Sequence, residues 1–235
     1  MKIIGYSERG AMNALFYGIA LKEDKQSMNK FLKAAGIEEE YIDYTVYSEF
    51  SLSDFGDPDM VIIADKENGK KDVIFIEAKV SVGKKFILSD QYKNHNEYVN
   101  QDEYQSGQSS NLFFQLRQKY YFFETKGKVD EQKDFEIQSL IKYYDQKQTG
   151  VRRIGNNEVV LKFMDEIKEC DFAHYIAIIP KSEESYDYKN EYGFDIHFIY
   201  WEDLVKIFEK YLSITIDYNQ TDNYNQILNR YEKNL

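Results

Sequence analysis

The chain has 235 residues, of which 41 are acidic and 30 are basic, and its formal net charge is −11. This length is enough for one domain with a sizeable buried core. The single cysteine, Cys170, excludes an intrachain disulfide and zinc-ribbon ligand sets, and the apolar runs are too short to span a bilayer. Residues 1–4 lead into polar sequence without the apolar segment of a secretory signal, so the sequence predicts a cytoplasmic protein.

Apolar periodicity predicts a chain of alternating helices and strands. In chain order, we expect helices at 8–21 and 28–35, strands at 45–50, 59–64 and 73–80, helices at 111–124, 134–146 and 157–169, strands at 174–179 and 195–200, a helix at 201–211 and a last helix in the polar tail after 217. Residues 84–110 and 181–193 are polar and are expected to be exposed connections. We expect a single domain, 1–235, whose C-terminal extension from about residue 130 is helical and then strand-helix. Because the strands at 59–64 and 73–80 are apolar on both faces, helices should cover both sides of the sheet.

Charged residues stand at the ends of these two apolar strands. Pro58-Asp59 precedes the first strand, and after seventeen intervening residues the second strand ends in Glu77-Ala78-Lys79. Side chains alternate along a strand, so Glu77 and Lys79 share one face. A hairpin that joins the matching faces would bring Asp59, Glu77 and Lys79 together. Two carboxylates beside an ammonium group form a site suited to a hard divalent cation with a base next to it.

This pattern resembles the signature of the PD-(D/E)xK nuclease superfamily, because both halves of the motif stand on apolar strands joined by a turn. The resemblance implies a restriction-endonuclease-like α/β fold, in which helices flank both faces of a mixed sheet, and a metal-dependent nuclease activity. It also implies that Asp59, Glu77 and the carbonyl of Ala78 ligate Mg²⁺ or Mn²⁺. Lys79 would then orient or deprotonate the attacking water.

A simpler interpretation of the same residues is an ordinary hairpin. In that case Asp59 forms an Asx-type turn, and Glu77 and Lys79 form a solvated pair. If the site does hold a metal, Asp54 and Asp57 are second choices as its ligands.

The flanking helices carry further candidates. Glu8 lies in the first turn of the helix at 8–21, where members of the superfamily often have a glutamate, and would complete the metal shell. The alternative is that Glu8 only interacts with the helix dipole. Gln115 and Lys119 resemble the glutamine or lysine that many members carry on the helix after the ExK strand, and Gln115 would position the water or the phosphate. For both residues the alternative is the surface of an amphipathic helix.

The net charge of −11 argues against a polyanionic partner, because nucleic-acid binders usually show a basic footprint. Basic residues nevertheless cluster near the motif, and Lys84, Lys85, Arg117 and Lys119 are the candidate phosphate contacts. The sequence therefore predicts a nuclease that acts on nucleic acid, DNA more than RNA, without a membrane partner. Two alternatives stay open: a catalytically silent nuclease-fold module that binds nucleic acid or a protein, and an assembly component whose acidic surface contacts a basic partner. A homodimer is open as well.

Overall fold

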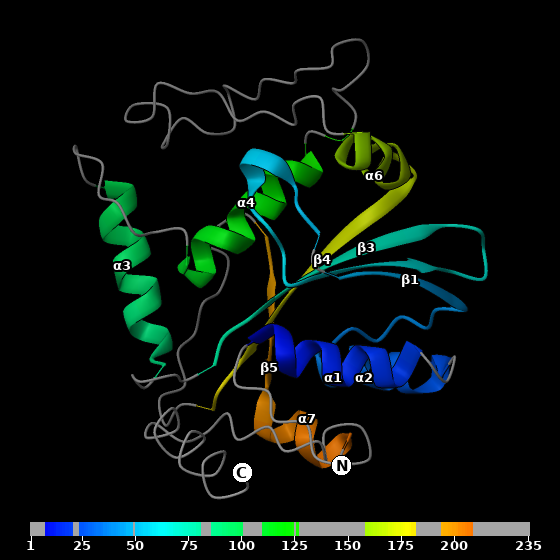
Figure 1. Ribbon diagram of the computed structural model, residues 1–235, viewed down its shortest axis with the longest axis horizontal. Helices are drawn as coiled ribbons and strands as arrows, with labels where there is room; N and C mark the ends of the chain where they lie inside the picture. The colour runs from blue at the N-terminus through cyan, green and yellow to red at the C-terminus, as the bar shows by residue number, and fades with distance from the viewer. Residues whose placement is uncertain are drawn as a thin grey trace, which may run out of the picture.

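The sheet at the centre of the molecule has five strands in the order β1–β2–β3–β4–β5 (Figure 1). The computed structural model describes residues 8–20, 24–48, 50–80, 86–100, 110–124, 126, 158–181 and 194–208. The strands are β1 (Asp43–Ser48), β2 (Met60–Asp65), β3 (Lys71–Ala78), β4 (Cys170–Ile179) and β5 (Ile196–Tyr200). β1, β2 and β3 pair antiparallel in sequence, whereas β4 runs parallel to β3, and β5 runs parallel to β4. The sheet is therefore mixed, and the predicted α/β class is confirmed.

Helices cover both faces of this sheet, as the doubly apolar strands predicted (Figure 1). One face is covered by α1 (Glu8–Ala20), α2 (Lys25–Ala34) and α7 (Trp201–Ile207). The other is covered by α3 (Leu88–Asn100), α4 (Leu112–Glu124), α6 (Glu158–Lys168) and the short 3-10 helix η1 (Ser53–Phe55). Alternate residues of β2 and β3 enter the two layers: Val61 and Phe75 pack beneath α4, and Ile62 and Ile74 pack on the α1 side.

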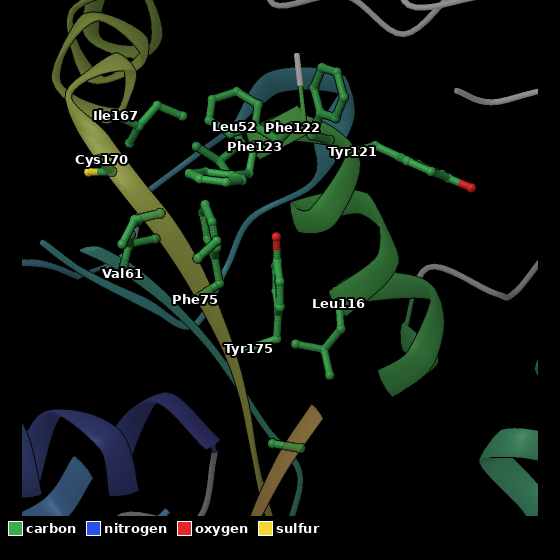
Figure 2. Packing of buried hydrophobic residues seen from close by; sticks show 14 of the residues in the cluster. Leu52, Val61, Phe75, Leu116, Tyr121, Phe122, Phe123, Ile167, Cys170 and Tyr175 are labelled. Carbon is green, nitrogen blue, oxygen red and sulfur yellow. The ribbon is translucent and has the colours of Figure 1, made fainter. Parts of the chain in front are cut away.

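The core beneath α4 is rich in aromatic side chains (Figure 2). The rings of Phe75 and Tyr175 stack with their centroids 5.8 Å apart, and Phe122 of α4 packs edge-on against Phe55 of η1. Leu116, Phe122 and Phe75 are fully buried, and burying a side chain of this kind stabilises the fold by about 1.5–3 kcal/mol. This packing fixes α4 against β3, the strand that carries the second half of the motif.

The segment 84–110 differs from the exposed connection that its polar composition predicted. Residues Leu88–Asn100 form α3, and its buried Leu88 and Tyr92 lie one helical turn apart, facing the core. The side chain of Asn111 donates to the backbone carbonyl of Gln91 over 2.7 Å, which ties α3 to the start of α4. The apolar stripe is only a few residues wide, so the polar residues around it hid the helix in the sequence.

The remaining boundaries agree with the predicted elements to within a few residues. The largest differences are at β4, which begins at Cys170 instead of 174, and at α7, which ends at Ile207 instead of 211. The helix expected at 134–146, the loop residues 182–193 and the last helix after 217 lie outside the described residues. Of the helices that the structure describes, none is both long enough and apolar enough to cross a membrane.

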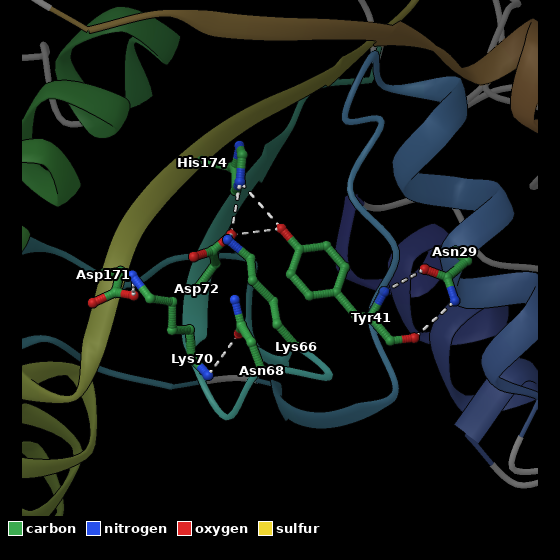
Figure 3. Close-up of polar contacts among 8 residues, drawn as sticks. All are labelled: Asn29, Tyr41, Lys66, Asn68, Lys70, Asp72, Asp171 and His174. Atoms are coloured by element: carbon green, nitrogen blue, oxygen red, sulfur yellow. Dashed lines mark hydrogen bonds and ion pairs between the residues drawn. The ribbon is translucent and has the colours of Figure 1, made fainter.

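A buried polar network holds the start of β3 (Figure 3). Asp72 is fully buried, and its Oδ2 lies 2.6 Å from the Lys66 ammonium, 2.7 Å from the Tyr41 hydroxyl and 3.4 Å from Nε2 of His174. Burial raises the pKa of this carboxyl, but hydrogen bonds from His174, Lys66 and Tyr41 outweigh that effect and leave the pKa below its ordinary value. The network joins β3, β4, the β2–β3 turn and the loop before β1.

We expect Asp72→Asn to lower the free energy of unfolding by about 1–3 kcal/mol, because the buried donors around it lose their charged acceptor. Asp171→Asn is the matched control: Asp171 pairs with Lys70 over 3.0 Å, but both side chains are exposed, so its loss should be within about 0.5 kcal/mol. Urea unfolding of both variants measures the difference. The contribution of Asp72 to the free energy of unfolding should disappear as the pH falls through the lowered pKa of this carboxyl. If both variants lower the free energy of unfolding by the same amount, the buried network does not stabilise the fold.

Candidate metal and catalytic site

The two halves of the sequence motif meet at one end of the β2–β3 hairpin. Met60 pairs with Ile76 across the hairpin, and continuing this register by one residue places Asp59 beside Glu77. Oδ2 of Asp59 accepts a hydrogen bond from the backbone N–H of Ala78 over 2.7 Å. The carboxylate of Asp59 is thus held against the end of β3.

Glu77 is fully buried beneath α4, so it does not form the solvated pair of the simpler interpretation. Its Oε1 lies 3.0 Å from Nζ of Lys119, which is itself only 1% exposed. The Lys119 ammonium also donates to the backbone carbonyl of Phe55 over 3.2 Å. Lys119 therefore lies inside the protein as the partner of Glu77, away from the surface position expected of a phosphate contact.

Gly56 allows this close approach of η1 to α4. Its φ of +79° lies in the left-handed region that favours glycine, and a Cβ atom built there would stand 3.2 Å from Nζ of Lys119. A larger residue would strain the turn and press on the Lys119–Glu77 pair.

The electrostatics of the site link five charged side chains. Burial raises the pKa of Glu77 to about 7; Asp59 acts in the same direction, and the ammonium groups of Lys119 and Lys79 act in the opposite one. Burial also raises the pKa of Glu8, again with Asp59 acting in the same direction and Lys79 opposing it. Asp59 and Lys79 therefore influence both Glu8 and Glu77 at this end of the sheet.

The backbone around Lys79 is anchored on both sides. Its N–H donates to the carbonyl of Ile178 over 2.8 Å, and its carbonyl accepts from Nε1 of Trp201 over 2.9 Å. The indole of Trp201, at the start of α7, is fully buried. These contacts hold the last residues of the motif between β4 and α7, and the Lys79 side chain is half-buried.

On α4, Gln115 lies one turn before Lys119 and so shares its face of the helix. Its Oε1 is buried and, within the described part of the chain, accepts no hydrogen bond. Arg117 lies elsewhere: its Nε donates to the Tyr121 hydroxyl over 2.7 Å, and its guanidinium group lies over the Tyr121 ring.

Other candidates from the sequence take no observed part in the site. Lys84 and Lys85 lie outside the described residues, and Asp57 is exposed. The side chain of Asp54 also falls outside the described part. The sequence contains a weak indication that Lys119 is buried. At helical spacing, Lys119 lies on the same stripe as the buried Leu112, Leu116 and Phe123.

A divalent cation at this end of the sheet would need oxygen ligands from these side chains. Among the described residues, no three His, Cys, Asp or Glu side chains are grouped so that they could hold a metal ion by themselves. Mg²⁺, however, is usually held by one or two carboxylates, with water and substrate phosphate oxygens completing its shell. Neither buried carboxylate oxygen of Glu77 accepts a hydrogen bond within the described residues, although Oε1 has its ion pair with Lys119. Asp59 and Glu77, with the carbonyl of Ala78, fit such a two-carboxylate site.

Comparison of the chain with family models, with curated proteins and with solved structures gave no match in any of the three.

Proposed function

We propose that the protein is a metal-dependent nuclease with a restriction-endonuclease-like fold, which hydrolyses phosphodiester bonds in nucleic acid, DNA more than RNA. One observation carries the proposal: Asp59 and Glu77 lie side by side at the end of neighbouring strands, within electrostatic reach of Lys79 and Glu8. Buried charges at a strand end cost several kcal/mol, on the order of 3–5, when they are unpaired. Lys119 pairs with Glu77, and a bound cation would balance the half-buried carboxylates of Asp59 and Glu8.

In this mechanism each residue has a defined task. Asp59 and Glu77, with the carbonyl of Ala78, would hold Mg²⁺ or Mn²⁺, and Glu8 would reach the same ion directly or through water. The ion, when bound, supplies a Lewis acid that polarises the phosphate and lowers the pKa of the attacking water. Lys79 would orient or deprotonate that water and offset the charge that develops on the phosphate.

Two residues of α4 would support this arrangement. Lys119 acts through Glu77, because its ammonium group at 3.0 Å holds the buried carboxylate in place. Gln115, with a buried amide oxygen that accepts no hydrogen bond in the described chain, would position the water or the phosphate. Because the net charge is −11, binding of nucleic acid should depend on the divalent ion to bridge phosphate and carboxylates.

A second candidate is the catalytically silent nuclease-fold module. The Lys119–Glu77 pair favours it, because an ammonium group at 3.0 Å already neutralises one of the two carboxylates. In that case the fold would bind nucleic acid or a protein without cleaving it.

The test is a cleavage assay with the purified full chain, labelled single- and double-stranded DNA and RNA, and Mg²⁺, Mn²⁺ or a chelator. We expect metal-dependent cleavage that Lys79→Ala abolishes and that Lys206→Ala retains, since Lys206 is exposed on α7. Cleavage that survives the chelator or Lys79→Ala would contradict the proposal. Metal-dependent binding without cleavage by the unaltered chain would establish the silent module instead.

A further inference from the structure

A cavity of about 740 Å³ opens at the start of β4 and β5. Lys71 pairs with Cys170 and Glu77 pairs with Ala177 in the parallel β3–β4 ladder, so the first residues of β4 lie at the opposite end of the sheet from Glu77. The loop after α2, the last turns of α4 and the residues before β5 complete the lining. This cavity is therefore separate from the candidate nuclease site.

The lining is strongly acidic. It includes the carboxylates of Glu38, Glu39, Glu124, Asp171 and Asp195, and no lysine or arginine is among the lining residues that the structure describes. Asp171 is paired over 3.0 Å with Lys70, which lies outside the lining, so the charge of this one carboxylate is already balanced. Burial lowers the pKa of His197, which also lines the cavity. The His197 ring therefore adds little positive charge at neutral pH, and the cavity favours a cation.

Aromatic rings stand beside these carboxylates. Tyr120 and Phe194 stack with their centroids 4.8 Å apart, and Phe172 is 55% exposed at the start of β4. The face of an aromatic ring attracts ammonium and guanidinium groups, and that attraction adds to the attraction of nearby carboxylates.

His174 supplies an acceptor in the same lining. The residue is 6% exposed, and its Nε2 lies 3.4 Å from Oδ2 of Asp72 (Figure 3). Because the carboxylate can only accept and the Tyr41 hydroxyl already donates to it, Nε2 of a neutral imidazole carries the proton. Nδ1 is then an acceptor, and Figure 3 shows it turned away from Asp72. This atom is buried and has no hydrogen-bond partner in the described chain.

We propose that this cavity binds an organic cation, an ammonium or guanidinium group that donates to His174 Nδ1, lies against the aromatic rings and is balanced by the carboxylates. The cation could be a free polyamine or arginine-like metabolite, or a basic side chain of a peptide. All three features of the lining, namely its negative charge, its rings and its buried acceptor, match this chemistry. The inference does not depend on the proposed nuclease activity.

Calorimetric titration of the full chain at low salt tests the proposal. The probes are spermidine, arginine amide and an acetylated pentapeptide with a central arginine; citrulline amide and the citrulline pentapeptide are their neutral isosteres. We expect the cations to bind and the citrulline analogues to bind at least about tenfold more weakly. Binding of the peptide alone would identify a protein as the source, and binding of the free cations too would identify a metabolite.

Two sets of variants locate the binding. Glu38→Gln/Glu39→Gln should weaken cation binding about two- to thirtyfold, as expected when two exposed carboxylates lose their ion pairs with the cation. Glu67→Gln/Glu97→Gln, which removes two carboxylates outside the cavity lining, is the matched control. Phe172→Leu should weaken binding about two- to fivefold, because it removes the ring and keeps an apolar side chain. The proposal is overturned if no cation binds, if the citrulline analogues bind equally well, or if Glu38→Gln/Glu39→Gln leaves the Kd unchanged.

Discussion

Asp59→Asn is expected to lower the rate of metal-dependent cleavage about a hundredfold or more, because it removes one of the two carboxylates that would hold the ion. The fold should tolerate the change, since the amide oxygen of asparagine can still accept from the N–H of Ala78. We therefore expect the free energy of unfolding to change by less than about 1 kcal/mol without metal. Cleavage rates and urea unfolding, measured on the same preparations, separate the two effects.

Asp57→Asn is the matched control for this variant. Asp57 stands two residues earlier in the same loop, but it is exposed. Its cleavage rate should stay within about twofold of that of the unaltered chain, as for most surface substitutions. If Asp57→Asn abolishes cleavage and Asp59→Asn does not, Asp57 takes the role of the ligand and the proposed site is wrong.

The second large effect concerns stability. We expect Lys119→Met to lower the free energy of unfolding by about 3–5 kcal/mol at a pH of about 8.5, because it leaves the ionised Glu77 buried without its partner. The pKa of Glu77 is raised to about 7 by burial, so at a pH of about 5.5 the group is protonated and the loss should shrink to about 1–3 kcal/mol. Thermal and urea unfolding across this pH range measure the change.

The raised pKa of Glu77 also determines the direction in which the stability of the unaltered chain changes with pH. A carboxyl whose pKa is higher in the folded state stabilises the fold below its unfolded pKa, and this contribution is lost as the pH rises through about 7. The control variant Lys93→Met, on the exposed face of α3, keeps the pH dependence that comes from Glu77, and the loss of stability that the substitution itself causes should be the same at both pH values. The double variant Glu77→Gln/Lys119→Met should recover most of the stability at high pH, because no buried charge is left unpaired. If Lys119→Met lowers the free energy of unfolding by the same amount at both pH values, Glu77 and Lys119 do not form a charged pair.

The pairing of Glu77 with Lys119 changes one expectation from the sequence. Two clustered carboxylates repel each other without metal, which by itself predicts that removing Glu77 leaves stability unchanged or raised. Lys119 lies 3.0 Å from Glu77 and is buried with it, so Glu77→Gln would leave a buried ammonium group without its carboxylate. Asp59→Asn is therefore the cleaner test of function.

Much of the fold could be predicted because its signals are local. Alternation along β2 and β3 gave the two faces of the hairpin, and the apolar residues on both faces required helices on both sides. The same alternation placed Asp59 and Glu77 together, because the register of an antiparallel hairpin follows from its short turn. α3 was missed because its buried face, with Leu88 and Tyr92, is narrow within a polar segment.

By itself, the sequence determined the hairpin, its charged end and the α/β class, since each depends on periodicity over a few neighbouring residues. Only the tertiary structure decided what surrounds that end. Lys119 reaches Glu77 across 42 positions of sequence, and the His174–Asp72 contact spans 102. Such contacts depend on how α4 and β4 pack against β3, and the free energy of that packing is spread over the whole core, so no local pattern records it.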